Sequence, residues 1–135
     1  MFNQYAYLYI EDDPLSREVL SMMMKTAMQV EQLDMFESSE TFLERIQKLD
    51  RRPDIILMDI HMQPFDGFEM LTMLRSLPDF RDVKVIALTA SVMSEEIEAL
   101  RASGFDGAIG KPLSVQTFPG LIKRILQDES VWHIA

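Results

Sequence analysis

The chain of 135 residues is 47% hydrophobic, which suits one globular domain and excludes a disordered chain. It has no cysteine, which excludes disulfides and thiolate metal sites and favours the cytoplasm, and no apolar run approaches the roughly 20 residues of a membrane-spanning helix. The net charge of −9, from 22 acidic and 13 basic residues, disfavours binding to nucleic acid because phosphate backbones would be repelled.

Strands and helices alternate along the chain. Short apolar runs predict strands at residues 7–10, 33–36, 55–58, 83–88 and 107–109. Helical spacing, caps and stops predict a helix after each strand: one opened by Pro14, one from Ser38 or Ser39 to about residue 50, one over residues 68–77, one from Ser94 to a stop at Gly104, and one that ends near residue 127. Pro119 falls inside the last pattern, so this helix is expected to start late or irregularly.

Five strand–helix units with nearly continuous apolar strands predict an α/β fold, a five-stranded parallel sheet with helices on both faces. The first helix carries apolar residues on one face, as a helix packed on such a sheet does: Leu15, Val19, Met23 and Ala27. No linker or repeat indicates a second domain, so one domain is expected over residues 1–127. Residues 128–135 lack periodicity and are expected to form a loose tail, with Trp132 packed on the domain.

Polar residues follow four of the predicted strands. They are Glu11, Asp12 and Asp13 after the first strand, Asp59 after the third, Thr89 after the fourth and Lys111 after the fifth. Sites in parallel sheets form beyond the carboxyl ends of the strands, so these side chains are expected to converge. Neighbouring carboxylates repel each other unless a cation joins them, and oxygen ligands without a histidine or cysteine cluster favour Mg²⁺.

Asp59 is predicted to be the nucleophile at this edge of the sheet. A carboxylate that attacks a phosphoryl group forms an acyl phosphate, and the surroundings must neutralise charge on the transferring oxygens. Mg²⁺, the Lys111 ammonium, and the Thr89 hydroxyl with nearby backbone amides are suited to that task. The sequence therefore predicts phosphoryl transfer to Asp59.

The same stretches resemble the receiver domain of response regulators over about residues 5–127. The matching segments are residues 9–17, 53–62, 66–67, 87–90 and 110–112. The resemblance implies a CheY-like, flavodoxin-like (βα)5 fold, a Mg²⁺ cofactor and a role in two-component phosphorelay signalling. It also implies that Asp12 binds the metal directly, that Glu11 acts through water, and that Asp13 is an exposed spacer. Beside Asp59, the backbone carbonyl of His61 would complete the metal contacts.

The resemblance also implies partners. The phosphoryl donor would be a phosphohistidine on a sensor histidine kinase or a phosphotransfer protein, and phosphorylation would change binding to a downstream protein partner. The face expected to change is built from the fourth helix, the last strand and the last helix. Receivers catalyse only their own phosphorylation and dephosphorylation, so an enzyme that acts on other substrates is not expected. A stand-alone regulator, favoured by the start at Met1, and a piece of a hybrid kinase are both open, as is a homodimer.

Two positions depart from the family pattern. Gln63 separates Met62 from Pro64, where receivers commonly have Met-Pro, and this alters the shape of the loop. Ala108 stands three residues before the lysine, where receivers usually carry a tyrosine or phenylalanine that turns inward on activation. Signal is therefore expected to pass through the backbone and the Thr89 loop.

Two functions other than phosphoryl acceptance stay open. Ala108 keeps open a phosphorylation-independent scaffold that uses the same face constitutively. A small-molecule phosphatase is the least favoured function, since a haloacid-dehalogenase-like hydrolase would carry a second aspartate where this chain has His61. The side chain of His61, together with Ser91, is instead expected at the pocket mouth, where it would tune access of water to the acyl phosphate. With His133 as the second of two histidines, a histidine metal site is not expected.

Overall fold

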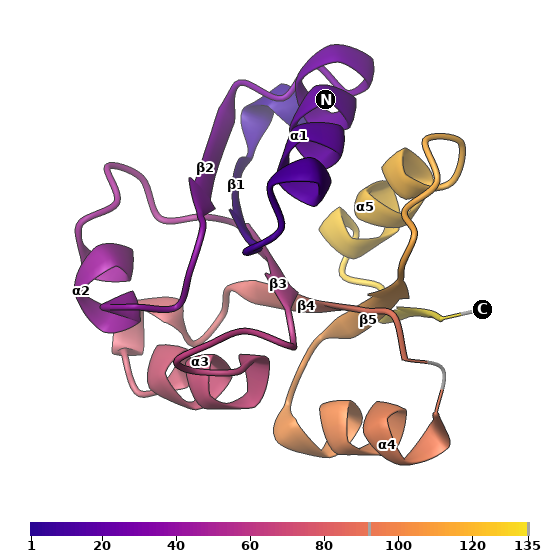
Figure 1. Ribbon diagram of the computed structural model, residues 1–135. Coiled ribbons are helices and arrows are strands. Elements are labelled where there is room, and N and C mark those ends of the chain that lie inside the picture. The colour runs from indigo at the N-terminus through magenta and orange to yellow at the C-terminus, as the bar shows by residue number, and fades with distance from the viewer. Residues whose placement is uncertain (92, 135) are drawn as a thin grey trace.

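A parallel six-stranded sheet, ordered β2-β1-β3-β4-β5-β6, forms the centre of the computed structural model, which describes residues 1–91 and 93–134 (Figure 1). The strands are Ala6–Ile10 (β1), Gln32–Phe36 (β2), Ile55–Asp59 (β3), Lys84–Thr89 (β4), Gly107–Gly110 (β5) and Val131–His133 (β6). The helices are Pro14–Met22 (α1), continued as a π-helix over Met23–Ala27 (η2), then Phe42–Gln47 (α2), Gly67–Arg75 (α3), Ser94–Ser103 (α4) and Phe118–Leu126 (α5), with 3-10 turns at Phe2–Gln4 (η1) and Pro78–Phe80 (η3). The predicted alternation of strands and helices is confirmed.

Helices cover both faces of the sheet, with α1 and α5 on one side and α2, α3 and α4 on the other (Figure 1). Successive strand residues point to opposite faces, so β1 sends Tyr7 and Tyr9 to the α1–α5 side and Leu8 and Ile10 to the other. All five residues of β1 and of β3 are buried. This double burial explains the nearly continuous apolar strands of the sequence.

The prediction of five strands and a loose tail is wrong, because Val131–His133 forms a sixth strand beside β5. Three residues are too few to produce a periodic pattern, so β6 could not be recognised from the sequence. Its close approach depends on glycines of β5. A Cβ atom on Gly107 would overlap the carbonyl oxygen of Val131, and one on Gly110 would overlap that of Ile134.

Of the predicted apolar face of the first helix, only Met23 packs in the core. Leu15 is 67% exposed and Val19 is 48% exposed, whereas Leu20 and Met24 are fully buried. Apolar residues occur all around this segment, and two faces could therefore have been chosen from spacing alone. The outcome is a helix that buries one apolar face and leaves a second one on the surface.

The helices begin and end close to the limits predicted from proline and glycine positions, but two predicted caps are wrong. The side chain of Ser39 is buried and accepts a hydrogen bond from the Phe65 amide at 2.8 Å, while α2 starts later, at Phe42. Ser94 lies inside α4 and does not cap it. Gly104 ends α4 with φ of 98°, as predicted, and α5 starts late, at Phe118. Across residues 1–91 and 93–134, none of the helices has the length and apolar character needed to span a membrane.

Candidate functional site

Three carboxylates meet at the carboxyl edge of the sheet. Glu11 follows β1 and is buried, Asp59 ends β3 and is 7% exposed, and Asp12 is exposed at the rim. One oxygen from each lies within 4.8 Å of the others. The parallel register brings the strand ends to one level, since Asp59 is opposite Leu88 and Thr89 is opposite Gly110. The predicted convergence is confirmed for Glu11, Asp12 and Asp59.

Lys111 lies between two of these carboxylates. Its ammonium nitrogen is 2.6 Å from Glu11 Oε1 and 3.3 Å from Asp59 Oδ2. The Lys111 backbone N–H donates to the Thr89 carbonyl at 2.8 Å, which anchors the start of the β5–α5 loop to the end of β4. Three carboxylates and one ammonium leave an excess of negative charge in the pocket, which a divalent cation would balance.

Burial and neighbouring charges shift the pKa values of three side chains in the pocket. Burial raises the pKa of Asp59 to about 6, with a further contribution from the hydrogen bond to Glu11, although Lys111 and the His61 amide oppose the shift. Burial alone would also raise the pKa of Glu11, but hydrogen bonds to Asp59 and Lys111 outweigh it and lower that pKa. Desolvation alone would lower the pKa of Lys111, but the hydrogen bonds and negative charges of Glu11 and Asp59 together outweigh it and raise that pKa. Of these three side chains, Asp59 is the one whose charged form the metal-free pocket disfavours.

Thr89 is buried, and its hydroxyl points to α4. The hydroxyl donates to Glu96 Oε1 at 3.1 Å and accepts from the Ser91 amide at 3.0 Å. The same oxygen of Glu96 lies 3.5 Å from Nε2 of His61, whose side chain is 67% exposed. The His61 ring thus lies beside Glu96 on the surface, and its effect on water access stays a prediction. The His61 amide donates to Asp59 Oδ1 at 3.1 Å.

Sequence reasoning missed several residues that hold the acids in place. The Tyr9 hydroxyl donates to Glu11 Oε1 at 3.1 Å, and Arg17 donates to the Glu11 backbone carbonyl at 2.9 Å. Asp13 is exposed, as expected of a spacer, but it also caps α1 by accepting from the Ser16 amide at 3.0 Å. Tyr9 could have been found, because residues two apart on a strand share a face.

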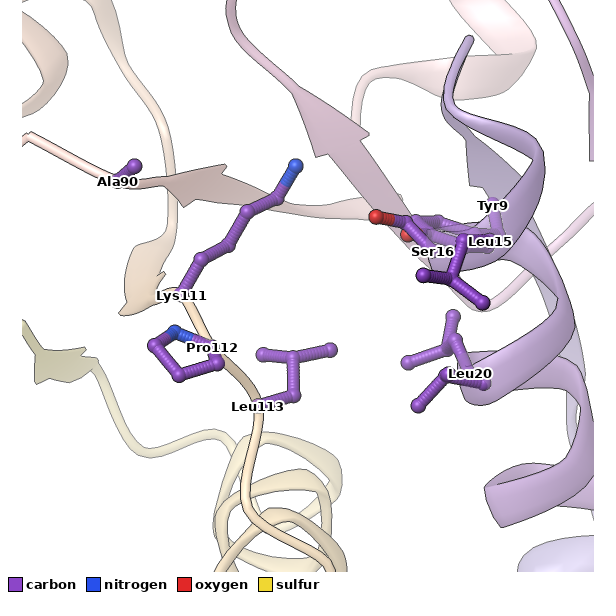
Figure 2. Close-up of a pocket in the computed structure, with 9 residues that line it drawn as sticks. Tyr9, Leu15, Ser16, Leu20, Ala90, Lys111, Pro112 and Leu113 are labelled. Atoms are coloured by element: carbon purple, nitrogen blue, oxygen red, sulfur yellow. The ribbon is translucent and has the colours of Figure 1, made fainter.

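An apolar groove of about 370 Å³ opens beside the acidic pocket. Its lining comes from β1, α1 and the loops after β4 and β5: Tyr9, Leu15, Ser16, Val19, Leu20, Ala90, Lys111, Pro112 and Leu113. Figure 2 shows Leu113 facing Leu15 and Leu20 across the groove, while the Lys111 side chain extends away from them. The exposed apolar face of α1 therefore borders the pocket that holds Asp59.

Known proteins share this architecture. The sequence profile of the response regulator receiver domain family matches residues 7–123. The polar-differentiation response regulator DivK of Brucella anthropi is 39% identical over 79 residues, which are 58% of this chain and 64% of that relative, just under two thirds of its length. Solved structures also share the fold. The chemotaxis response regulator CheY4 of Vibrio cholerae has a TM-score of 0.79 at 22% identity over 90% of this chain and 98% of its own.

The second solved structure is the receiver domain of the sensor histidine kinase PA1611 from Pseudomonas aeruginosa. It has a TM-score of 0.75 at 24% identity, covers 92% of this chain and 95% of its own, and has a magnesium ion coordinated in its active-site cleft. The sheet order, the helices on both faces and the acids at the carboxyl edge define a CheY-like α/β domain. The chain belongs to the response regulator receiver domain family, and thus to two-component signalling.

Proposed function

We propose that this chain accepts a phosphoryl group on Asp59 from a phosphohistidine donor in a Mg²⁺-dependent reaction. The observation that carries the proposal is the cluster itself: oxygens of Glu11, Asp12 and Asp59 within 4.8 Å of one another, with the Lys111 ammonium 3.3 Å from Asp59. The magnesium ion in the cleft of the PA1611 receiver domain supports the choice of metal.

The residues present suit Mg²⁺. Asp12, Glu11, Asp59 and the backbone carbonyl of His61 would hold it, since they offer only oxygen and carry more negative charge than Lys111 balances. When bound, the ion supplies positive charge to the transferring phosphoryl oxygens. The raised pKa of Asp59 gives a second reason, because a cation beside this carboxylate would favour its charged, nucleophilic form.

The chain's own residues would then perform the transfer. An Asp59 oxygen forms a bond to phosphorus while the bond from phosphorus to the donor imidazole nitrogen breaks, and its electron pair stays on that nitrogen. Lys111 is close enough to donate to a phosphoryl oxygen once it releases Glu11. Thr89 would donate to another after its hydroxyl turns away from Glu96. Ala90 leaves space beside it.

Phosphorylation of Asp59 is tested by intact-mass measurement after incubation with acetyl phosphate and Mg²⁺. We expect one added phosphoryl group on the wild-type chain, none on Asp59→Asn, and none when the metal is chelated. An adduct that survives Asp59→Asn would contradict the proposal. Sustained release of phosphate from added esters would instead indicate a phosphatase, whereas we expect turnover only of the chain's own acyl phosphate.

A phosphorylation-independent scaffold is the second candidate, and Ala108 favours it because β5 carries no aromatic ring at that buried position. The two functions differ in one measurable respect. A switch binds its downstream partner with different affinities before and after phosphorylation, whereas a scaffold binds equally in both states. Equal affinities in the presence of a confirmed adduct would favour the scaffold.

The groove next to Lys111 suits the protein that donates the phosphoryl group. In-line attack brings the donor imidazole to about 3 Å from Asp59, so the donor's surface must rest on the pocket rim, where Leu15 and Val19 are exposed. We expect Leu15→Asp to slow phosphotransfer from a histidine kinase or phosphotransfer protein about tenfold or more, by removing an apolar anchor. Acetyl phosphate needs no docking, so its reaction should be unchanged. An equal loss with both donors would contradict this role for Leu15.

A further inference from the structure

The C-terminal strand β6 is fitted closely to β5. Figure 1 shows this yellow strand beside β5 at the edge of the sheet. Val131 is opposite Gly107, Trp132 is opposite Ala108, and the close approach needs the absence of a side chain at Gly107 and Gly110. The edge of β5 is thus covered by the chain's own segment.

Trp132 lies on the side of the sheet that α4 covers. Register partners in neighbouring parallel strands share a face, and Ala108 belongs to the core on the α4 side, against which Trp132 packs. The Arg101 guanidinium of α4 stacks over the indole ring, 4.3 Å from its centroid. This cation–π contact ties the last turn of α4 to β6.

The first turn of α4 is tied to the proposed phosphorylation site. Glu96 accepts the hydrogen bond of the Thr89 hydroxyl at 3.1 Å. Leu88, the residue before Thr89, is the register partner of Asp59. One ten-residue helix therefore contacts the site through Glu96 and the C-terminal strand through Arg101.

The packing of α4 leaves it free to shift. Leu100 is its one fully buried residue, so few apolar contacts oppose a small movement of the helix. A threonine hydroxyl carries a single proton, which here is donated to Glu96. If Thr89 donates that proton to a phosphoryl oxygen, Glu96 loses this hydrogen bond, and its carboxylate faces the new negative charge.

We propose that α4 couples phosphorylation of Asp59 to β6: release of Glu96 from Thr89 shifts α4 and changes the packing of Trp132 under Arg101. The surface formed by α4 and β6 is then the one that differs between the two states. Trp132 supplies, from the neighbouring strand, an aromatic side chain that reports the state of the site. This inference rests on the proposed function, since its trigger is the phosphoryl group on Asp59.

The test uses the full chain, whose single tryptophan is Trp132. Phosphorylation by acetyl phosphate with Mg²⁺ is quantified by intact mass, and tryptophan emission is recorded on the same samples. We expect emission to shift in proportion to the phosphorylated fraction. Arg101→Gln should abolish most of the shift while the adduct still forms, because it removes the contact between α4 and the ring.

Glu96→Ala tests the other end of the helix. Before phosphorylation, the Trp132 emission of this variant should already resemble that of the phosphorylated wild type. It should change little when the adduct forms. Glu98→Ala removes the same charge from an exposed position of α4 and should respond as the wild type does. Failure to form an adduct overturns the proposed function and the coupling together. An adduct with unchanged Trp132 emission, or Glu96→Ala behaving like Glu98→Ala, overturns the coupling alone.

Discussion

Replacing Lys111 with methionine is expected to lower the free energy of unfolding of the metal-free protein by about 2–3 kcal/mol. The ammonium lies 2.6 Å from Glu11, which is 1% exposed, so its removal leaves a buried carboxylate without its charged partner. Removal of one member of a fully buried pair typically costs about 3–5 kcal/mol. The expected loss is smaller because the Lys111 side chain is 24% exposed. Urea unfolding in the presence of a chelator measures it.

The same variant should bind Mg²⁺ more tightly and accept phosphate more slowly. Without the ammonium the three carboxylates attract a divalent cation more strongly, so Mg²⁺ should stabilise Lys111→Met more than it stabilises the wild type. Phosphorylation by acetyl phosphate should slow by about a hundredfold, the usual effect of losing one donor to the transition-state oxygens. Lys123→Met makes the same change at an exposed site on α5 and should alter none of these quantities. If Lys111→Met were as stable as the wild type, the burial of the Glu11 carboxylate would not depend on the positive charge of Lys111.

The site could be predicted to a large extent because parallel strands end at one edge. Asp59, Thr89 and Lys111 each follow an apolar run, and the register of neighbouring strands then determines that they converge. The strands themselves were recognisable because both faces of the sheet are covered, which makes each strand apolar throughout. Fold class and site thus depend on the same buried runs.

The features that escaped prediction depend on tertiary contacts. β6 is held by backbone approach to Gly107 and Gly110, which has no signature in the sequence of β6 itself. The rotation of α1 is decided by which of two apolar faces fits the sheet, and this placed Leu20 inside and Leu15 outside. Glu96 lies on a helix whose position relative to Thr89 follows from packing and not from strand order. In each case local pattern allowed more than one arrangement.

The features that escaped prediction lie on two different sides of the predicted site. The exposed face of α1 borders the side of the pocket from which a donor would approach, whereas α4 and the Trp132 side chain of β6 lie on the other face of the sheet. The residues proposed to perform the phosphoryl transfer follow from the family pattern, whereas the contacts proposed to transmit the signal are particular to this chain. Ala108 is consistent with that division, because the aromatic side chain beside it comes from Trp132 of β6.

Replacing Asp59 with asparagine is expected to stabilise the metal-free protein at neutral pH by up to about 3 kcal/mol. Burial raises the pKa of Asp59 from 3.8 to about 6, and each pKa unit corresponds to about 1.4 kcal/mol. At pH values well below 3.8 the carboxyl is protonated in both the folded and the unfolded chain. As the pH rises towards 6, the unfolded chain loses its proton first, so the folded state loses stability, and above this range the loss is complete.

Asparagine has the same shape and no charge, so the advantage of Asp59→Asn should grow between pH 4 and pH 6 and then level off. Unfolding by urea at a series of pH values in a chelator measures this difference, with Asp50→Asn as a control at an exposed position. Mg²⁺ should narrow the gap, because it stabilises the charged wild-type pocket and binds the variant less well. An advantage that is equal at pH 4 and pH 8 would sink the electrostatic account. The charged form of Asp59 is therefore expected to destabilise the metal-free wild type, and bound Mg²⁺ is expected to relieve that loss of stability.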